Sequence, residues 1–176
     1  MFRFPRPILY VKIHPDMLSV RNVKNGENIC EPPLVAILGG IKIESSNLQG
    51  GARHTGSNPK IIAIGSDAKA KEDQKDMRIV NPFAHPRTPL SDFTVAEMLI
   101  KGFIRKLSGH KLSVLSPLMV LHLAIELEGG ITQIEARALK ELGVAIGAKW
   151  CCGWIGPDLT DEQVIAWHFP DNGKVI

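Results

Sequence analysis

The sequence lacks the features that mark several classes of protein. It has only three cysteines, Cys30 and the adjacent pair Cys151 and Cys152. An odd number with one adjacent pair does not fit a disulfide framework and indicates a reducing compartment. No apolar run approaches the ~20 residues of a membrane helix, and the first residues lack the apolar stretch of a signal peptide. The net charge is only +3 and the basic residues are scattered, unlike those of a nucleic-acid-binding face. We therefore expect a cytoplasmic protein with no nucleic-acid partner.

Motifs for common cofactors are absent as well. The three glycine pairs, at 39–40, 50–51 and 129–130, do not belong to a phosphate loop, because neither a Gly-x-x-x-x-Gly-Lys-Ser/Thr run nor a Gly-x-Gly-x-x-Gly run occurs. The six histidines are not spaced as metal ligands with one another or with the cysteines. The sequence predicts no cofactor and no metal.

What is present fits one globular domain spanning residues 1–176. The composition, 44% hydrophobic and 22% charged, is ordinary for such a domain, and a chain of this length buries roughly 70% of its surface. Residues 39–58 are rich in Gly, Ser and Asn and predict a flexible insertion loop. The sequence leaves open whether that insertion has a function.

The first half of the chain predicts short strands. Residues 8–11, 18–23 and 34–38 are expected to form a three-stranded antiparallel meander, with turns near Asp16 and at Asn25-Gly26. Residues 61–64 predict a short buried strand, and Ser66 is expected to cap a brief helix through Lys71. Residues 77–80 are predicted to be extended, and 81–89, with three prolines, to form a stiff non-helical connector.

The second half predicts helices alternating with buried strands. Three pairs, Thr94 with Glu97, Thr132 with Glu135 and Thr160 with Gln163, have the spacing of a capping box. The expected apolar stripe of the first helix is Ala96, Leu99, Ile100, Phe103, Ile104 and Leu107. That of the second, which Gly147 ends, is Ile134, Ala138, Leu142, Ala145 and Ile146. The third helix is expected to be short and to reach Trp167.

Residues 118–125 and 150–155 are apolar enough to be strands of a parallel sheet. A meander followed by alternating helices and strands predicts an α/β fold with a mixed sheet and right-handed crossovers. This is the element order of the ribonuclease H-like fold, among others.

Four residues carry candidate chemistry. His85 lies between prolines, and His122 lies within an apolar strand; we expect a turn histidine and a hydrogen-bonded core histidine, respectively. Cys151 and Cys152 lie in a predicted buried strand, where packing is the expected role. A small enzyme of unknown class that uses these cysteines or His85 stays open as an alternative.

Several stretches, in order, resemble the bacterial actin homologue MreB, the rod-shape protein family, over its first lobe. They are residues 31–37 (EPPLVAI), 63–69 (AIGSDAK), 91–99 (SDFTVAEML), 130–138 (GITQIEARA) and 147–149 (GAK), and the resemblance covers about residues 8–157. It implies an actin-like version of the ribonuclease H-like fold.

The resemblance also implies that the nucleotide site is degenerate. The family's Asp-x-Gly-Thr-x-Asn motif, which holds ATP phosphates and magnesium, corresponds here to residues 12–17 (KIHPDM). Lys12 stands in place of a metal-side carboxylate, and His14 in place of a glycine that lets backbone approach phosphate. The family's catalytic Glu-Glu-Pro run corresponds to residues 155–157 (IGP), which contain no carboxylate. The sequence then stops before the family's second phosphate loop and second lobe.

The resemblance therefore implies a pseudo-ATPase, with no catalytic residue of its own, that acts through a protein partner. An actin-like filament in cell-shape or division machinery is one expected partner, and a homo-oligomer is another. The second alternative is one half of a split nucleotide-binding protein that another chain completes. Phe2, Arg3, Phe4 and Arg6 alternate aromatic and basic character and are the candidate contacts to a membrane or partner, although an ordinary edge strand is expected there.

Overall fold

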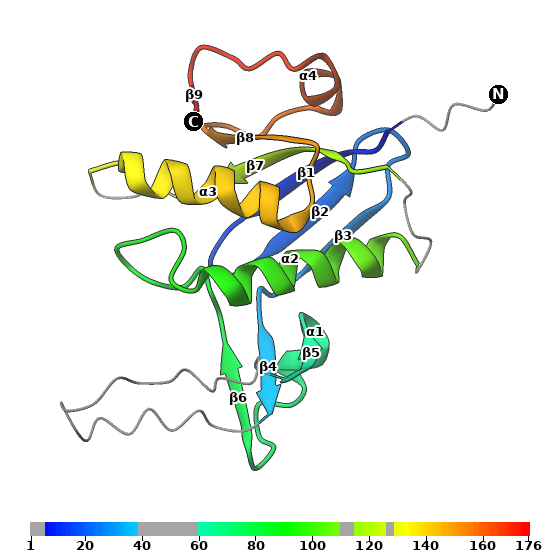
Figure 1. Cartoon of the computed structure of the whole chain (residues 1–176), viewed down its shortest axis with the longest axis vertical. Helices are drawn as coiled ribbons and strands as arrows, with labels where there is room; N and C mark the ends of the chain where they lie inside the picture. The colour runs from blue at the N-terminus through cyan, green and yellow to red at the C-terminus, as the bar shows by residue number, and fades with distance from the viewer. Residues whose placement is uncertain (1–5, 39–59, 110–114, 126–128) are drawn as a thin grey trace, which may run out of the picture.

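The computed structural model describes residues 6–38, 60–109, 115–125 and 129–176. Within these ranges the chain forms a six-stranded sheet, a three-stranded sheet and four helices (Figure 1). The predicted insertion loop at 39–58 lies outside the described residues, as do Phe2, Arg3 and Phe4 of the N-terminal candidates.

The six-stranded sheet is mixed, as predicted. Its spatial order is β3 (Asn28–Glu31), β2 (Leu18–Asn22), β1 (Ile8–Ile13), β7 (Leu118–Leu123), β8 (Trp150–Ile155) and β9 (Lys174–Val175). The first three strands pair antiparallel, β7 runs parallel to both β1 and β8, and β9 closes the edge antiparallel to β8. The central β7 is almost entirely buried, which fits its continuous apolar sequence.

The predicted third strand of the meander, at 34–38, was wrong. The third strand is β3, because the chain turns sharply at Gly26, which has φ 74°, and Asn22 N–H donates to the Glu27 carbonyl at 2.9 Å. Pro32 and Pro33 follow β3 and cannot donate to a ladder, so pairing with β2 stops before them. The apolar segment beyond the prolines enters the smaller sheet instead.

The smaller sheet has the order β5 (Lys60–Ile64), β4 (Val35–Leu38) and β6 (Met77–Val80), all antiparallel. β5 lies at an edge and is only partly buried, so the prediction of a buried strand was wrong there. Ser66 begins α1 (Ser66–Lys69) but does not cap it, since the capping position is Gly65, with φ 64°. The extended segment at β6 and the non-helical connector at 81–89 are confirmed.

Helices α2 (Phe93–Leu107) and α3 (Gln133–Ile146) cover one face of the larger sheet, and the smaller sheet extends beyond α2 (Figure 1). Apolar side chains of both helices meet those of β1, β2 and β7 in the main core. The predicted stripe of α2 is buried through its centre, at Ala96, Leu99, Ile100 and Phe103. Its cap is Asp92, which accepts from Val95 N–H at 3.0 Å, so the predicted Thr94 box was wrong.

The capping box of α3 at Thr132 and Glu135 is confirmed, as is its end at Gly147. Its buried face is rotated relative to the prediction. Ile134 is 82% exposed, while the residues buried against the sheet are Leu139, Leu142, Gly143 and Ile146. Gly143 allows close contact, because a Cβ there would lie 2.3 Å from Cys151 Sγ.

Part of the opposite face of the sheet is covered by the C-terminal segment. Helix α4 (Asp161–Ala166), with its predicted Thr160 capping box confirmed, packs with Leu159 and Phe169 over β1, β7 and β8 in a second apolar cluster. Tyr10 and Trp154 are its large buried members. None of the helices in the described ranges is long and apolar enough to cross a bilayer.

The two sheets are joined by an ion-pair junction of Glu31, Lys106 and Asp67. Lys106 Nζ of α2 lies 3.0 Å from Glu31 Oε2 at the end of β3 and 2.9 Å from Asp67 Oδ2 in α1. Glu31 Oε2 also accepts from Ser66 N–H at 2.9 Å. Burial alone would lower the pKa of Lys106, but hydrogen bonds to Asp67 and Glu31 outweigh it and raise that pKa.

Candidate functional site

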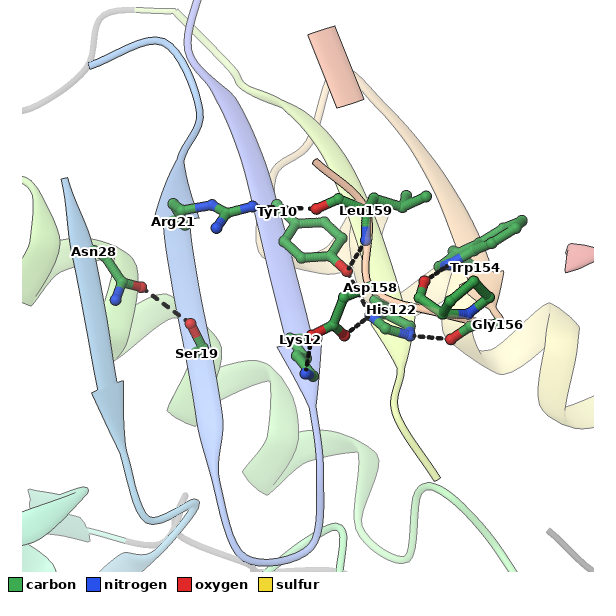
Figure 2. Close-up of polar contacts among 11 residues, drawn as sticks. Tyr10, Lys12, Ser19, Arg21, Asn28, His122, Trp154, Gly156, Asp158 and Leu159 are labelled. Atoms are coloured by element: carbon green, nitrogen blue, oxygen red, sulfur yellow. Dashed lines mark hydrogen bonds and ion pairs between the residues drawn. The ribbon is translucent and has the colours of Figure 1, made fainter. Parts of the chain in front are cut away.

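The region that the sequence matched to a nucleotide site lies where β1, β7 and β8 end. Strand pairing aligns Lys12 of β1 with His122 of β7, and His122 with Trp154 of β8. Because side chains alternate along a strand, Tyr10 and Lys12 share the face of His122, opposite α2 and α3. The segment after β8, residues 156–159, passes over this face (Figure 2).

The hairpin between β1 and β2 has no backbone N–H group left to bind an anion. His14 N–H donates to the Met17 carbonyl at 3.1 Å, and Met17 N–H donates to the His14 carbonyl at 3.2 Å. Pro15 has no N–H, and Asp16 N–H donates to His14 Nδ1 at 3.2 Å. A phosphate-binding loop needs several backbone donors that point at the ligand, and all four positions of this turn are occupied or lack a donor.

Lys12 does not stand alone beside this hairpin, since it is paired with a carboxylate. Its Nζ lies 2.6 Å from Asp158 Oδ2, and the other Asp158 oxygen lies 3.7 Å from His122 Nδ1 (Figure 2). Residues 155–157 contain no carboxylate, but the next residue, Asp158, places one at this site. The negative charge of Asp158 offsets the positive charge of Lys12. The site therefore offers neither an unpaired cation to a phosphate nor an unpaired carboxylate to a metal ion.

A chain of hydrogen bonds fastens the 156–159 segment to the sheet. Leu159 N–H donates to Tyr10 Oη at 3.2 Å, and the Tyr10 hydroxyl donates to His122 Nδ1 at 2.5 Å. His122 Nε2–H donates to the Gly156 carbonyl at 2.9 Å; because a carbonyl oxygen can only accept, the ring proton lies on Nε2 and Nδ1 accepts from Tyr10. Trp154 Nε1–H donates to the Pro157 carbonyl at 2.8 Å.

The two titratable members of this chain are held neutral. His122 is 1% exposed, and burial lowers its pKa against the opposing effects of Gly156 and Asp158. Burial raises the pKa of Tyr10 to about 12. The prediction that His122 is a hydrogen-bonded core histidine is confirmed. We call the hydrogen-bonded series Leu159–Tyr10–His122–Gly156 the latch, because it holds the 156–159 segment on the sheet.

The other candidate residues do not join this site as reactive groups. Cys152 is 4% exposed and packs in the second apolar cluster, and Cys151 packs against the main core. Burial raises the pKa of both thiols to about 12, which keeps them protonated at neutral pH. Their predicted packing role is confirmed.

His85 is exposed in a turn, where its Nδ1 accepts from Arg87 N–H at 3.2 Å. Of the N-terminal candidates only Arg6 is described, and its carbonyl accepts from Lys24 Nζ at 2.8 Å. The residues that sequence reasoning missed are Tyr10 and Asp158. A single tyrosine in a buried strand was a usable signal, whereas no local pattern links Asp158 to Lys12.

Comparison with known proteins supports the fold only. No protein-family model matches the chain, and no curated protein matches its sequence. Among solved structures, MreB5 of Spiroplasma citri bound to ADP is 19% identical with a TM-score of 0.57, over 83% of this chain and 37% of that one. A non-polymerising mutant of MamK bound to AMPPNP is 13% identical with a TM-score of 0.59, over 85% of this chain and 40% of that one. The chain has an actin-like fold and spans about two fifths of the length of these neighbours.

Proposed function

We propose that this actin-like domain neither binds nor hydrolyses ATP by itself and acts in the cytoplasm through protein–protein interaction. The observation that carries the proposal is the closed hairpin at 14–17, whose backbone donors are all occupied or absent. The pairing of Lys12 with Asp158 supports it, because the carboxylate offsets the lysine charge that would otherwise attract a phosphate.

The expected partner is an actin-like filament in bacterial cell-shape or division machinery. A domain that keeps the fold but lacks the phosphate-binding groups can still bind other proteins through its surface. The two neighbours reported above have ADP or AMPPNP bound in their structures, so these nucleotides are the ligands to test on this chain.

Nucleotide binding is tested by thermal unfolding of the purified chain with Mg-ATP, Mg-ADP and no ligand. We expect the same melting temperature in all three, because only a ligand that binds the folded state stabilises it. An intact MreB protein, which should be stabilised, serves as the positive control. A reproducible upward shift with either nucleotide would show that the hairpin can accept phosphate and would refute the first half of the proposal.

The interaction is tested by co-sedimentation with polymerised MreB-type filaments, in parallel with a mass measurement in solution. We expect the chain to pellet with filaments and to stay in the supernatant without them. No co-sedimentation at high filament concentration would reject the filament partner, and a concentration-dependent mass would instead identify a homo-oligomer.

A second candidate function is one half of a split nucleotide-binding protein. The observation that favours it is the coverage, since the chain spans only 37–40% of its structural neighbours. In that case Mg-ATP would raise the melting temperature only when the complementary chain is added. The absence of any shift in the mixture would exclude this candidate.

A further inference from the structure

A groove of about 500 Å³ lies between strand β5 and helix α2, away from the hairpin and the latch. Residues 61–64 of β5 form one wall, and Met98, Lys101, Gly102 and Arg105 of α2 form the other. The helix approaches the strand closely at Gly102, where a Cβ would lie 2.4 Å from Ile64 Cδ1. The groove is therefore lined by apolar side chains of β5 and Met98 together with the longer, charged side chains of Lys101 and Arg105.

The groove follows an edge of the smaller sheet. β5 is the end strand in the order β5-β4-β6 and pairs only with β4 within the part of the chain that the structure describes. The groove touches four consecutive residues of this strand, 61–64, which include Ile62, the residue that a β-bulge leaves without a partner on β4. An unpaired edge of this kind is a template for an added strand.

The charge beside the groove has one sign. Among the residues that the structure describes, Lys101 and Arg105 line it and no Asp or Glu does, and the exposed Lys60 begins the strand. Lys101 is partly neutralised by Glu97, whose Oε1 lies 2.6 Å from Lys101 Nζ. Arg105 has no ion pair within the described residues, so at least one cation beside the groove is available to a ligand.

We propose that this groove binds an extended acidic segment of a partner protein, which adds to β5 as a further strand. Alternate apolar side chains of that segment would pack on Met98 and the β5 side chains, and its carboxylates would face Lys60 and Arg105. A second copy of this chain is a poorer occupant, because pairing two β5 edges would bring two sets of the same cations together. The inference goes beyond the proposed function, since it names a surface and a ligand chemistry that do not depend on the nucleotide site.

The test is fluorescence anisotropy of the full chain with a short labelled peptide in which valine alternates with glutamate. Two control peptides separate the contributions: one has lysine in place of glutamate, and one has N-methyl groups that prevent strand pairing. The variant is Arg105→Glu, and its matched control is Lys149→Glu, which makes the same charge change at an exposed position outside the groove. Circular dichroism checks that both variants fold.

We expect the acidic peptide to bind and both control peptides to fail. Arg105→Glu should weaken binding about fivefold or more at low salt, as expected for reversal of an exposed charge pair, and Lys149→Glu should leave it unchanged. Equal binding of the lysine peptide, or equal affinity of the two variants, would overturn the proposal. A dimer that the peptide dissociates would overturn it in favour of a second copy. If the acidic peptide does not bind, the proposal is overturned, whatever keeps the peptide out of the groove. None of these outcomes bears on the nucleotide test.

Discussion

Replacing Tyr10 with phenylalanine tests the latch that holds the 156–159 segment on the sheet. The tyrosine hydroxyl accepts from Leu159 N–H and donates to His122 Nδ1, while the ring packs in the second apolar cluster. Phenylalanine keeps the ring and removes only the hydroxyl. The change therefore isolates the two hydrogen bonds from the packing.

The expected cost follows from the burial of the partners. His122 is 1% exposed and Tyr10 is 5% exposed, so water cannot easily replace the lost hydroxyl. An unsatisfied buried donor or acceptor costs roughly 1–2 kcal/mol, so two of them should lower the free energy of unfolding by about 3 kcal/mol. For a chain of this size, that corresponds to a fall in melting temperature of about 6–12 °C.

Urea denaturation and thermal unfolding measure the loss, and Ser19→Ala is the control. Ser19 also loses a hydroxyl on the same sheet face, where it donates to Asn28 Oδ1 at 3.0 Å, but this bond is exposed and should cost about 0.5 kcal/mol or less. Tyr10 is the only tyrosine, so the absorbance of tyrosinate gives its pKa directly, which should be about 12. Equal destabilisation by the two variants, or an ordinary tyrosine pKa in the folded protein, would refute the latch.

Three further predictions concern other parts of the fold. Glu31→Ala should lower the free energy of unfolding by about 2 kcal/mol, because it removes charge-assisted hydrogen bonds to Lys106 and to a backbone N–H. Glu31→Gln keeps an acceptor and should cost about half of that in urea denaturation. Equal costs for the two variants would contradict the charge argument. Gly143→Ala should lower the free energy of unfolding by about 1 kcal/mol, because overpacking against Cys151 costs ~1–3 kcal/mol and helix propensity returns only ~1 kcal/mol. Urea denaturation measures the change, and a higher urea midpoint for the variant would show that α3 can shift away from β8. Burial lowers the pKa of His122, so as pH falls the unfolded chain takes up a proton at this residue before the folded chain does. The free energy of unfolding should therefore fall as pH drops below about 6.5. A His122→Gln variant whose free energy of unfolding has the same dependence on pH as that of the original protein would contradict this.

Local patterns in the sequence were enough to predict most elements and two of the three capping boxes. A box joins positions three residues apart, so Thr132 with Glu135 and Thr160 with Gln163 can be recognised without knowledge of the fold. The same pattern at Thr94 was wrong because Asp92, two residues earlier, competes for the cap. The buried central strands were also predictable, since both their faces are apolar.

The partners of those elements were decided by the tertiary structure. The sequence by itself determined that residues 12–17 hold Lys12, His14 and Pro15 where the resemblance to MreB places phosphate-binding groups, because the identity of a residue is a local fact. It did not determine that Asp158, far along the chain, would return to Lys12, that β4 would leave the meander for a second sheet, or that Ile134 would face outward. Such contacts join residues distant in sequence, and they are set by strand order and helix rotation, which no local periodicity specifies.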